Sequence, residues 1–543
     1  MSTTSQMKMI AKEHLLLLVA AGAALLGIPG AHAAAPGIIN TGTAGQFQLT
    51  AQAANITQPD GQMVYSWGYG CVSAPPASSF KPATSTAPFC SPMQIPGPTL
   101  IVTEGSSFTV TLTNNLPAPA GNTSILFPGL QVTGTSGGVA GLLTQEAANG
   151  AQVTYTVTAT TPGTHSYYSG TQQDLQIEMG MYGAIIVVPA GTLPTCPAHN
   201  LAAGQPDSSG HMPAAGEADY RLASSAYHLA QSCYDREYLF QFAEMDPNIH
   251  LQALAQVNAA LASGGCAAGA GSAGCNLQVP TEPYHPAYFM INGRSMPDDM
   301  DTNYASQYPY QPYNGNPHMH PGDLVLLRII GQGRWQHPFH EHGNHVRILA
   351  RDGNLITDAT GKALAGPLLF TTTTTPGQTM DGIFYWTGRG LNWDPYGHHP
   401  TSADPVAKLP CTADVNGYNT GDLTAVNYYE WCADHNKPMQ AQPFGDVPGG
   451  GPVTLPDPNL FTNGAWYGGS PYLGPNATAR AVGATGTTPP SGTIANSPSG
   501  EAGFAFMWHS HNEREITTNN IFPGGMFMMM LVDSREFAID ESN

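Results

Sequence analysis

Short runs of alternating or β-branched residues, separated by glycine and proline, are the feature that most limits how this chain can fold. Examples are TLIVTEGSSFTVTL at 99–112 and the segment 152–160. Alternation with a period of two is typical of strands with one buried face. Only 10% of residues are charged, while 62 glycines and 47 prolines interrupt the chain, which disfavours long surface helices carrying ion pairs. The pattern predicts an all-β protein built from sandwiches.

The beginning of the chain has the pattern of an export signal. Lys8 and Lys12 precede an apolar run at 15–26, and Ala31 and Ala33 follow at the spacing of a cleavage site. The alternative is that 15–26 forms a buried core helix. No later stretch approaches the ~20 apolar residues of a membrane helix. We therefore expect a signal peptide at 1–33 and an exported protein, periplasmic or extracellular, without membrane insertion.

The charge balance excludes one class of partner. Thirty-seven acidic and 17 basic side chains give a formal net charge of -20. A nucleic acid or an anionic membrane needs a basic face to offset phosphate repulsion. Neither is expected as a partner.

Eight cysteines fall into four neighbouring pairs along the chain: Cys71 with Cys90, Cys196 with Cys233, Cys266 with Cys275, and Cys411 with Cys432. In an oxidising compartment the simplest interpretation is four local disulfides, although eight cysteines allow 105 pairings. If all eight are bridged, no thiolate is left to bind a metal.

Composition and strand pattern divide the chain into two folding units. The first spans 38–190, and a segment rich in Ala, Gly, Pro and Ser at 191–233 is expected to be a linker. The second unit spans 234–543, and its strands are interrupted by an irregular stretch at about 388–503. That stretch is either an insertion or a third domain, because a structureless loop of such length is unusual. We favour the insertion.

Several segments resemble multicopper oxidases. IPGPTLIVTEGSSFTVTLTNNLP at 95–117 resembles the opening strands of that family, and YFMINGRSMP at 288–297 with PGDLVLLRIIGQG at 321–333 resembles the opening of its later domain. HPFHEHG at 337–343 is similar to the family's HPFHLHG copper motif, and WHSH at 508–511 with GGM at 524–526 is similar to its terminal HCH and GM. The resemblance implies tandem cupredoxin-like Greek-key β-sandwiches.

In that family, four His-x-His pairs hold a trinuclear copper cluster, and a separate blue copper bound by Cys, two His and usually Met collects electrons. The resemblance places the two first-domain pairs at residues 126–129 and 168–170, where this chain has no histidine. The blue-copper cysteine is replaced by Ser510. No histidine lies between His511 and the candidate axial ligand Met526. Thiolate supplies copper affinity and a route for electrons, so without it we expect no blue copper. The full cluster is not expected either, because the first-domain histidines are missing.

The last-domain pairs remain, as His340 with His342 and His509 with His511, and His337 matches the first blue-copper ligand. Side chains two apart on a strand point to the same face, so each pair can bind one ion. Imidazole ligands suit copper or zinc, and the Irving–Williams order favours copper. We expect a copper site at these residues, with zinc as the second choice.

Other histidines, carboxylates and methionines lie near these motifs in the sequence. His345, and the pair His318 with His320, are either further ligands or solvated loop residues, and His398 and His399 are expected at the surface. Glu341 alternates away from its neighbouring histidines and is expected to orient other groups. Glu513 and Glu515 are either proton carriers or members of a solvated turn. Most of Met526, Met528, Met529 and Met530 are expected in the core.

Three functions are compatible with these features. The first is an exported copper-dependent oxidoreductase that uses a four-histidine centre to oxidise a small reductant or a metal ion. The second is a copper sequestration or delivery protein without turnover. The third is a structural extracellular module with relic histidines. The chain can form a homo-oligomer, although its first domain has no histidines at the places that would complete a cluster in a neighbouring subunit.

Overall fold

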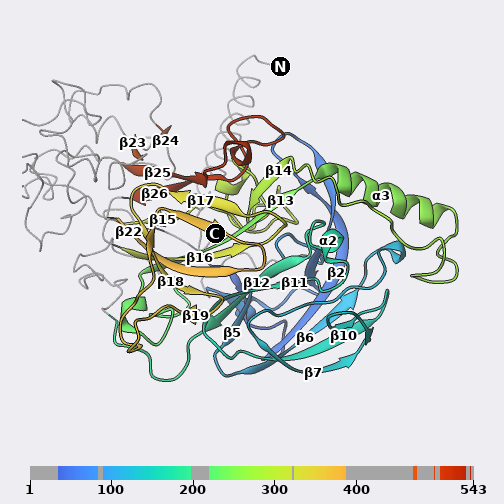
Figure 1. Cartoon of the computed structure of the whole chain (residues 1–543), viewed down its shortest axis with the longest axis horizontal. Helices are drawn as coiled ribbons and strands as arrows, with labels where there is room; N and C mark the ends of the chain where they lie inside the picture. The colour runs from blue at the N-terminus through green and yellow to red at the C-terminus, as the bar shows by residue number, and fades with distance from the viewer. Residues whose placement is uncertain are drawn as a thin grey trace, which may run out of the picture.

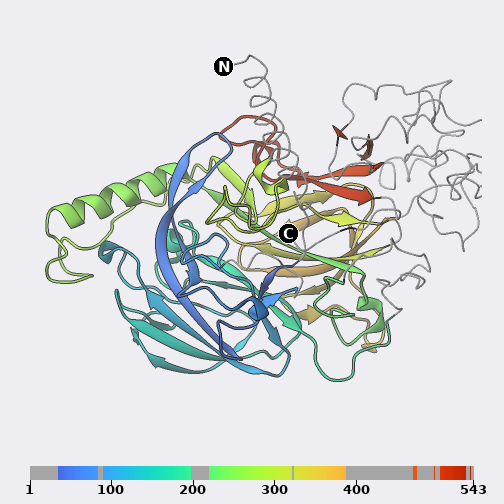
Figure 2. The ribbon, with the colours of Figure 1, turned by 180° about the vertical axis from the view of Figure 1, so that it is seen from behind.

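A computed structural model describes residues 35–82, 90–196, 219–320, 323–386, 469–473, 494–495, 502–533 and 539. The expected signal peptide, the pair Cys411 and Cys432, His398 and His399, and most of 388–503 lie outside these residues. The described chain is mostly β and contains two β-sandwiches in tandem. Figures 1 and 2 show the sandwiches against each other. No described helix is long and apolar enough to cross a membrane.

The N-terminal sandwich consists of two five-stranded sheets. One sheet has the order β11 (Gly163–Tyr168), β12 (Tyr182–Val188), β5 (Leu100–Thr103), β1 (Gly37–Ile38) and β4 (Phe80–Lys81). The other has the order β3 (Met63–Cys71), β2 (Gln46–Thr57), β6 (Ser107–Asn114), β10 (Gln152–Thr158) and β7 (Gln131–Gly137). Nearby are the short pair β8 (Val139–Ala140) and β9 (Gln145–Glu146), and helices η1 (Ala77–Ser79), η2 (Ala118–Ala120) and α2 (Gln173–Gln176).

Strand alternation predicted from sequence is visible in β6 and β10. In β6, Phe108, Val110 and Leu112 are buried between more exposed polar residues, and β10 buries Val153, Tyr155 and Val157 in the same way. The two strands pair antiparallel. Their buried faces belong to one core that also contains Trp67.

The C-terminal sandwich carries the histidine motifs. One sheet has the order β14 (Tyr288–Ile291), β13 (Arg236–Met245), β16 (Leu324–Gly331), β22 (Thr379–Tyr385), β18 (Val346–Arg351) and β19 (Asn354–Leu355), with β20 (Leu368–Leu369) on β18. The other has the order β15 (His318–Met319), β26 (Phe527–Asp533), β25 (Ala502–Ser510), β17 (His337–Glu341) and β21 (Thr371–Thr374). Within it, β23 (Gly469–Leu473) pairs with β25 and with β24 (Ile494–Ala495).

The core of this sandwich is aromatic and methionine-rich. Phe339 of β17 packs against Phe242 with ring centroids 4.7 Å apart and against Trp508 of β25 at 6.1 Å. Met526 and the inward-facing residues Met528 and Met530 belong to the same core, as expected from sequence. This packing fixes β17 and β25, the two strands that carry the histidine pairs.

Helix α3 (Pro247–Ala262) was not anticipated, because the composition argument addressed only helices with ion pairs and this one contains no charged residue. Asp246 caps its N-terminus by accepting a hydrogen bond from the Asn248 backbone N–H, and Pro247 occupies the first turn. The remaining helices are η3 (Ala230–Ser232), η4 (Asp298–Met300) and η8 (Glu513–Ile516). In Figure 1, α3 extends away from the histidine-bearing strands.

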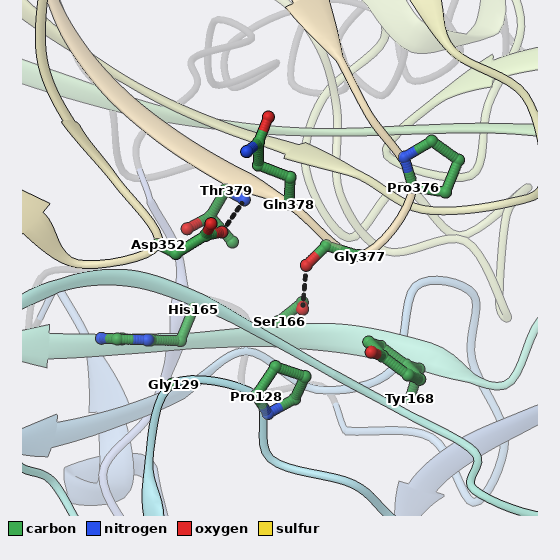
Figure 3. A pocket seen from close by; sticks show the side chains of 10 residues that line it. All are labelled: Pro128, Gly129, His165, Ser166, Tyr168, Asp352, Pro376, Gly377, Gln378 and Thr379. Atoms are coloured by element: carbon green, nitrogen blue, oxygen red, sulfur yellow. Dashed lines mark hydrogen bonds between the residues drawn. The ribbon is translucent and has the colours of Figure 1, made fainter.

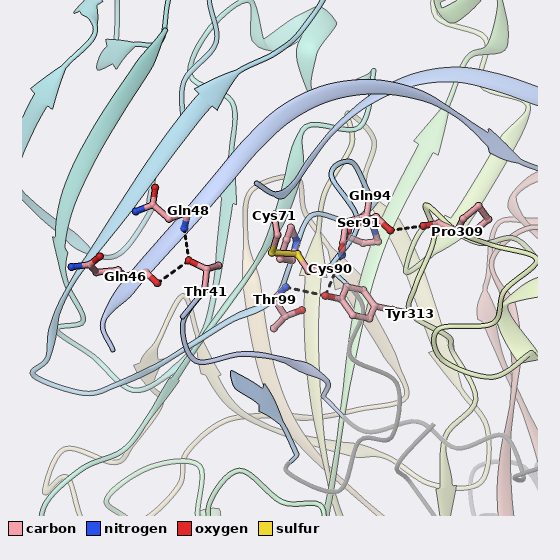
Figure 4. Close-up of a disulfide and its surroundings, with 12 residues drawn as sticks. Thr41, Gln46, Gln48, Cys71, Cys90, Ser91, Gln94, Thr99, Pro309 and Tyr313 are labelled. Atoms are coloured by element: carbon pink, nitrogen blue, oxygen red, sulfur yellow. Dashed lines mark hydrogen bonds between the residues drawn. A yellow bond between two sulfur atoms is a disulfide. The ribbon is translucent and has the colours of Figure 1, made fainter. Parts of the chain in front are cut away.

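Three of the predicted disulfides are present: Cys71–Cys90, Cys196–Cys233 and Cys266–Cys275. No cysteine in the described part of the chain is free. Beside the first disulfide the two sandwiches meet (Figure 4). Tyr313 accepts hydrogen bonds there from the Thr99 backbone N–H at 3.1 Å and the Gln94 amide at 3.2 Å. The disulfide therefore tethers a loop that contributes to this interface.

Candidate metal centre

The two predicted histidine pairs come together on one face of the C-terminal sandwich. Strands β17 and β25 pair antiparallel with His340 directly opposite His509. The His340 ring centroid lies 4.7 Å from that of His342, 5.6 Å from that of His509 and 4.9 Å from that of His511. The four imidazoles thus form one cluster, although the two pairs lie at least 167 positions apart in the sequence.

Backbone and indole hydrogen bonds hold the ends of these strands together. The His511 N–H donates to the Pro338 carbonyl at 2.7 Å, and the His342 N–H donates to the Met507 carbonyl at 3.3 Å. The buried Trp508 indole N–H donates to the His342 carbonyl at 3.0 Å. The histidine backbones are therefore positioned by the sheet and its core.

Individual ring atoms are also oriented. In His509, Nδ1 lies 2.8 Å from the Ser510 carbonyl, so Nδ1 carries the hydrogen and Nε2 keeps its lone pair. That Nε2 lies 3.2 Å from Nε2 of His342. Nδ1 of His340 lies 2.8 Å from the Thr371 hydroxyl.

The local environment favours the neutral form of His340 and His509. Burial and then the proximity of the other three rings lower the pKa of His340 to about 3. Burial also lowers the pKa of His509, and His511 contributes in the same direction. A neutral imidazole is the form that binds a metal. His340 and His342 are buried, whereas His511 is exposed, so the cluster opens toward solvent at one side.

The donor set fits copper or zinc, but the rings pack against one another as they stand. Within the described residues, no three or more His, Cys, Asp or Glu side chains are arranged to hold one metal ion. The His342 to His509 nitrogen separation of 3.2 Å is nevertheless close to the roughly 2.9–3.3 Å between adjacent ligands when each bond is ~2.0–2.1 Å. Rotation of the other two rings is needed for them to join this pair.

His337 lies apart from the cluster, on the inward face of β17. Its Nε2 is 2.9 Å from Glu244 and its Nδ1 is 2.9 Å from Glu515, and all three side chains are buried. Burial disfavours the charged ring, but the two carboxylates outweigh it and raise the pKa of His337 to about 9. Because both ring nitrogens are hydrogen-bonded to carboxylates, we leave His337 out of the proposed centre.

The position of the expected blue-copper cysteine belongs to the same network. The Ser510 hydroxyl donates to the Glu515 carboxylate, and the Asn512 amide donates to its other oxygen at 2.9 Å. Glu244 also accepts from the backbone N–H groups of Arg334 and Trp335. The buried polar groups around His337 and Ser510 therefore satisfy one another by hydrogen bonds.

Sequence reasoning missed Glu244 entirely. Its signal was a glutamate in the otherwise largely apolar strand REYLFQFAEM, where a buried charge requires a partner. Glu515 was considered, but as a proton carrier or a solvated residue, and the structure buries it. Glu513, in contrast, is exposed.

The remaining candidates occupy different environments. His318 and His320 are buried, so the alternative that they are solvated loop residues is wrong for both. His345 is partly exposed and packs on Phe370. Glu341 faces away from the histidine cluster, accepts a hydrogen bond from Thr372 at 2.6 Å, and has its pKa raised by burial to about 8.

Comparison with known proteins agrees with the copper-protein resemblance. Residues 81–191 match the family model described as multicopper oxidase. Similar solved structures include the multicopper oxidase mgLAC, with 15% identity, 91% of this chain and 88% of that chain covered, and a TM-score of 0.44. A blue copper oxidase from Nitrosomonas europaea has 14% identity, coverages of 89% and 85%, and a TM-score of 0.42. The copper nitrite reductase of the same organism has 16% identity, coverages of 72% and 98%, and a TM-score of 0.37. No curated protein matches the chain significantly.

Proposed function

We propose that the chain is a divergent multicopper oxidase, exported and copper-dependent, with a four-histidine centre and no blue copper; the match of residues 81–191 to the multicopper oxidase family model supports this. The observation that carries the proposal is the cluster of four imidazoles on paired strands, those of His340, His342, His509 and His511. The three disulfides support a location in an oxidising compartment.

The chain's own residues supply the ligands and their orientation. His342 and His509 would hold copper through the nitrogens that lie 3.2 Å apart, and His340 and His511 would complete the set. The Ser510 carbonyl fixes the His509 tautomer, and Thr371 orients His340. When bound, copper would supply one-electron oxidation and reduction.

The substrate of this centre would be a small reductant or a metal ion. Electrons would have to arrive at the four-histidine cluster itself, because Ser510 replaces the thiolate and both nitrogens of His337 are hydrogen-bonded. The exposed ring of His511 provides a route of approach from solvent. A homo-oligomer is compatible with this function.

The test combines metal analysis with oxygen uptake. The purified chain is loaded with Cu(II), dialysed, analysed for copper, and assayed for oxygen consumption with a panel of small reductants and metal ions. The double variant His340→Ala, His509→Ala is expected to lose copper and turnover. The control variant His228→Ala, His285→Ala removes two exposed histidines outside the cluster and is expected to retain both.

Turnover that survives the cluster double variant rejects the centre. An intense visible band near ~600 nm also contradicts the ligand set, because blue copper requires a thiolate. Failure of dialysed protein to retain copper or zinc would instead support a structural module.

A second function, copper sequestration or delivery, is favoured by the accessibility of one ligand. His511 is exposed while His340 and His342 are buried, an arrangement in which a partner could reach the metal from one side. Stoichiometric copper binding without oxygen uptake for every reductant would favour this function over oxidation.

A further inference from the structure

A separate cavity of about 360 Å³ lies between the two sandwiches, away from the histidine cluster. Pro128, Gly129 and three residues of β11, His165, Ser166 and Tyr168, form one wall (Figure 3). The opposite wall comes from two turns of the C-terminal sandwich and consists of Asp352 and the residues Pro376, Gly377, Gln378 and Thr379. The volume of the cavity is at the lower end of the roughly 300–1,000 Å³ range of small-molecule sites.

The two walls are fixed to each other by buried hydrogen bonds. The Thr164 N–H donates to Asp381 at 3.0 Å, and the Thr379 hydroxyl donates to the Thr164 carbonyl at 2.6 Å. The Ser166 hydroxyl donates to the Gly377 carbonyl at 3.4 Å. The cavity is thus present without a conformational change, which reduces the entropy lost on binding.

Polar groups at the cavity have hydrogen-bonding capacity left over. One oxygen of Asp352 accepts from the Thr379 N–H at 2.8 Å, while no described residue hydrogen-bonds its other oxygen. The Tyr168 hydroxyl and the Gln378 side-chain amide likewise have no hydrogen-bond partner among the described residues. These three groups together offer both donors and acceptors to a ligand.

The charge of the cavity narrows the ligand class. Among the described residues that line it, Asp352 is the only acidic side chain and there is no Lys or Arg, so an anion would meet uncompensated repulsion. His165 contributes no positive charge at neutral pH, because burial lowers its pKa. A protonated amine only donates: it can satisfy Asp352 and the Tyr168 and Gln378 oxygens, but it offers no acceptor to the Gln378 NH2 group. A hydroxyl group both donates and accepts.

We propose that this interdomain cavity binds a small uncharged polyol of one or two sugar rings, with Asp352, Tyr168 and Gln378 as its hydrogen-bonding groups. A smaller hollow of about 190 Å³ shares Tyr168, Pro376 and Gly377 with the cavity and extends it toward Gln332 and Gly333. The second ring of a longer ligand occupies this extension. This proposal is independent of the metal centre.

The test is saturation-transfer NMR on the full chain with D-glucose, maltose and myo-inositol, beside ethanolamine and acetate as cationic and anionic probes. At least one neutral probe is expected to bind, and acetate is not. Tyr168→Phe removes one hydroxyl and is expected to raise Kd about five- to tenfold, as loss of one neutral hydrogen bond does. Tyr310→Phe is the matched control, because Tyr310 is also half-buried but lies outside the cavity, and it should leave Kd unchanged.

Asp352→Asn separates a polyol from a cation. Asparagine can still accept from the Thr379 N–H, so a polyol should lose less than tenfold in affinity, whereas a cation should lose nearly all binding. The proposal is overturned if all three neutral probes fail to bind, if Tyr168→Phe and Tyr310→Phe have equal effects, or if ethanolamine binds best. Thermal unfolding of each variant checks that it is folded.

Discussion

Replacement of His337 by glutamine tests the buried carboxylate–imidazole–carboxylate network through its pH dependence. His337 is fully buried between Glu244 and Glu515, at 2.9 Å from each. Glutamine removes the positive charge and leaves two buried carboxylates without it. Breaking a buried ion pair in this way costs about 3–5 kcal/mol, so the variant is expected to be less stable by that amount at pH 7.

The sign of the pH effect follows from the raised pKa. The pKa of His337 is about 9 in the folded chain, against 6.5 for an ordinary histidine. Its stabilising contribution is therefore fully present below pH 6.5 and is lost as pH rises through 9. Between pH 7 and pH 10 the free energy of unfolding of the wild type should fall by about 2–3 kcal/mol through this group, a fall that the His337→Gln variant does not show.

Urea unfolding of metal-free protein, followed by tryptophan fluorescence at pH 7 and pH 10, measures both effects. Other groups titrate in this range, so the quantity of interest is the stability difference between wild type and variant, which should shrink at pH 10. His165→Gln is the matched control: burial lowers the pKa of His165, so its stability difference should be the same at both pH values. A His337→Gln difference that does not change with pH refutes a protonated His337 in the folded state.

Three further outcomes are expected. Thr371→Val removes the hydroxyl that supports His340 and should weaken copper binding about 10–100-fold in a chelator competition, whereas Thr373→Val, at the exposed position opposite Pro338 in the same strand, should not. The Ser510→Cys variant loaded with Cu(II) should show no intense band near ~600 nm, because both ring nitrogens of His337 already hydrogen-bond to carboxylates and cannot bind copper. Such a band would contradict the network. Cys71→Ala with Cys90→Ala opens a loop of sequence separation 19 and should cost about 3 kcal/mol in urea unfolding, and an unchanged midpoint would contradict this.

Local patterns in the sequence predicted the β architecture and the disulfides. Strand β10 (Gln152–Thr158) lies within the predicted segment 152–160, because an alternating run between turns has few alternatives. The three described disulfides join cysteines that are neighbours along the chain, so short loop closure selects them. Helix α3 was not predicted because the expectation relied on charge content. Asp246 as N-cap and Pro247 at the first helical position are nevertheless typical of a helix N-terminus.

The histidine cluster was predictable in part. A period of two places His340 with His342 and His509 with His511 on common faces, and only the family resemblance indicated that the two strands pair. The exact register, with His340 opposite His509, depends on core packing around Phe339 and Trp508. Sequence separation alone carries no information about that register.

The network around His337 could not be inferred from local pattern, because Glu244, His337 and Glu515 come from three elements distant in sequence. Its existence changes what the missing thiolate means. A protonated His337 donates to both carboxylates, which leaves the three groups with a net charge of −1, and Ser510 and the backbone N–H groups of Arg334 and Trp335 donate to the two carboxylates as well. We therefore expect this position to respond to pH, because a thiolate restored at residue 510 would add negative charge to a network that is already negative.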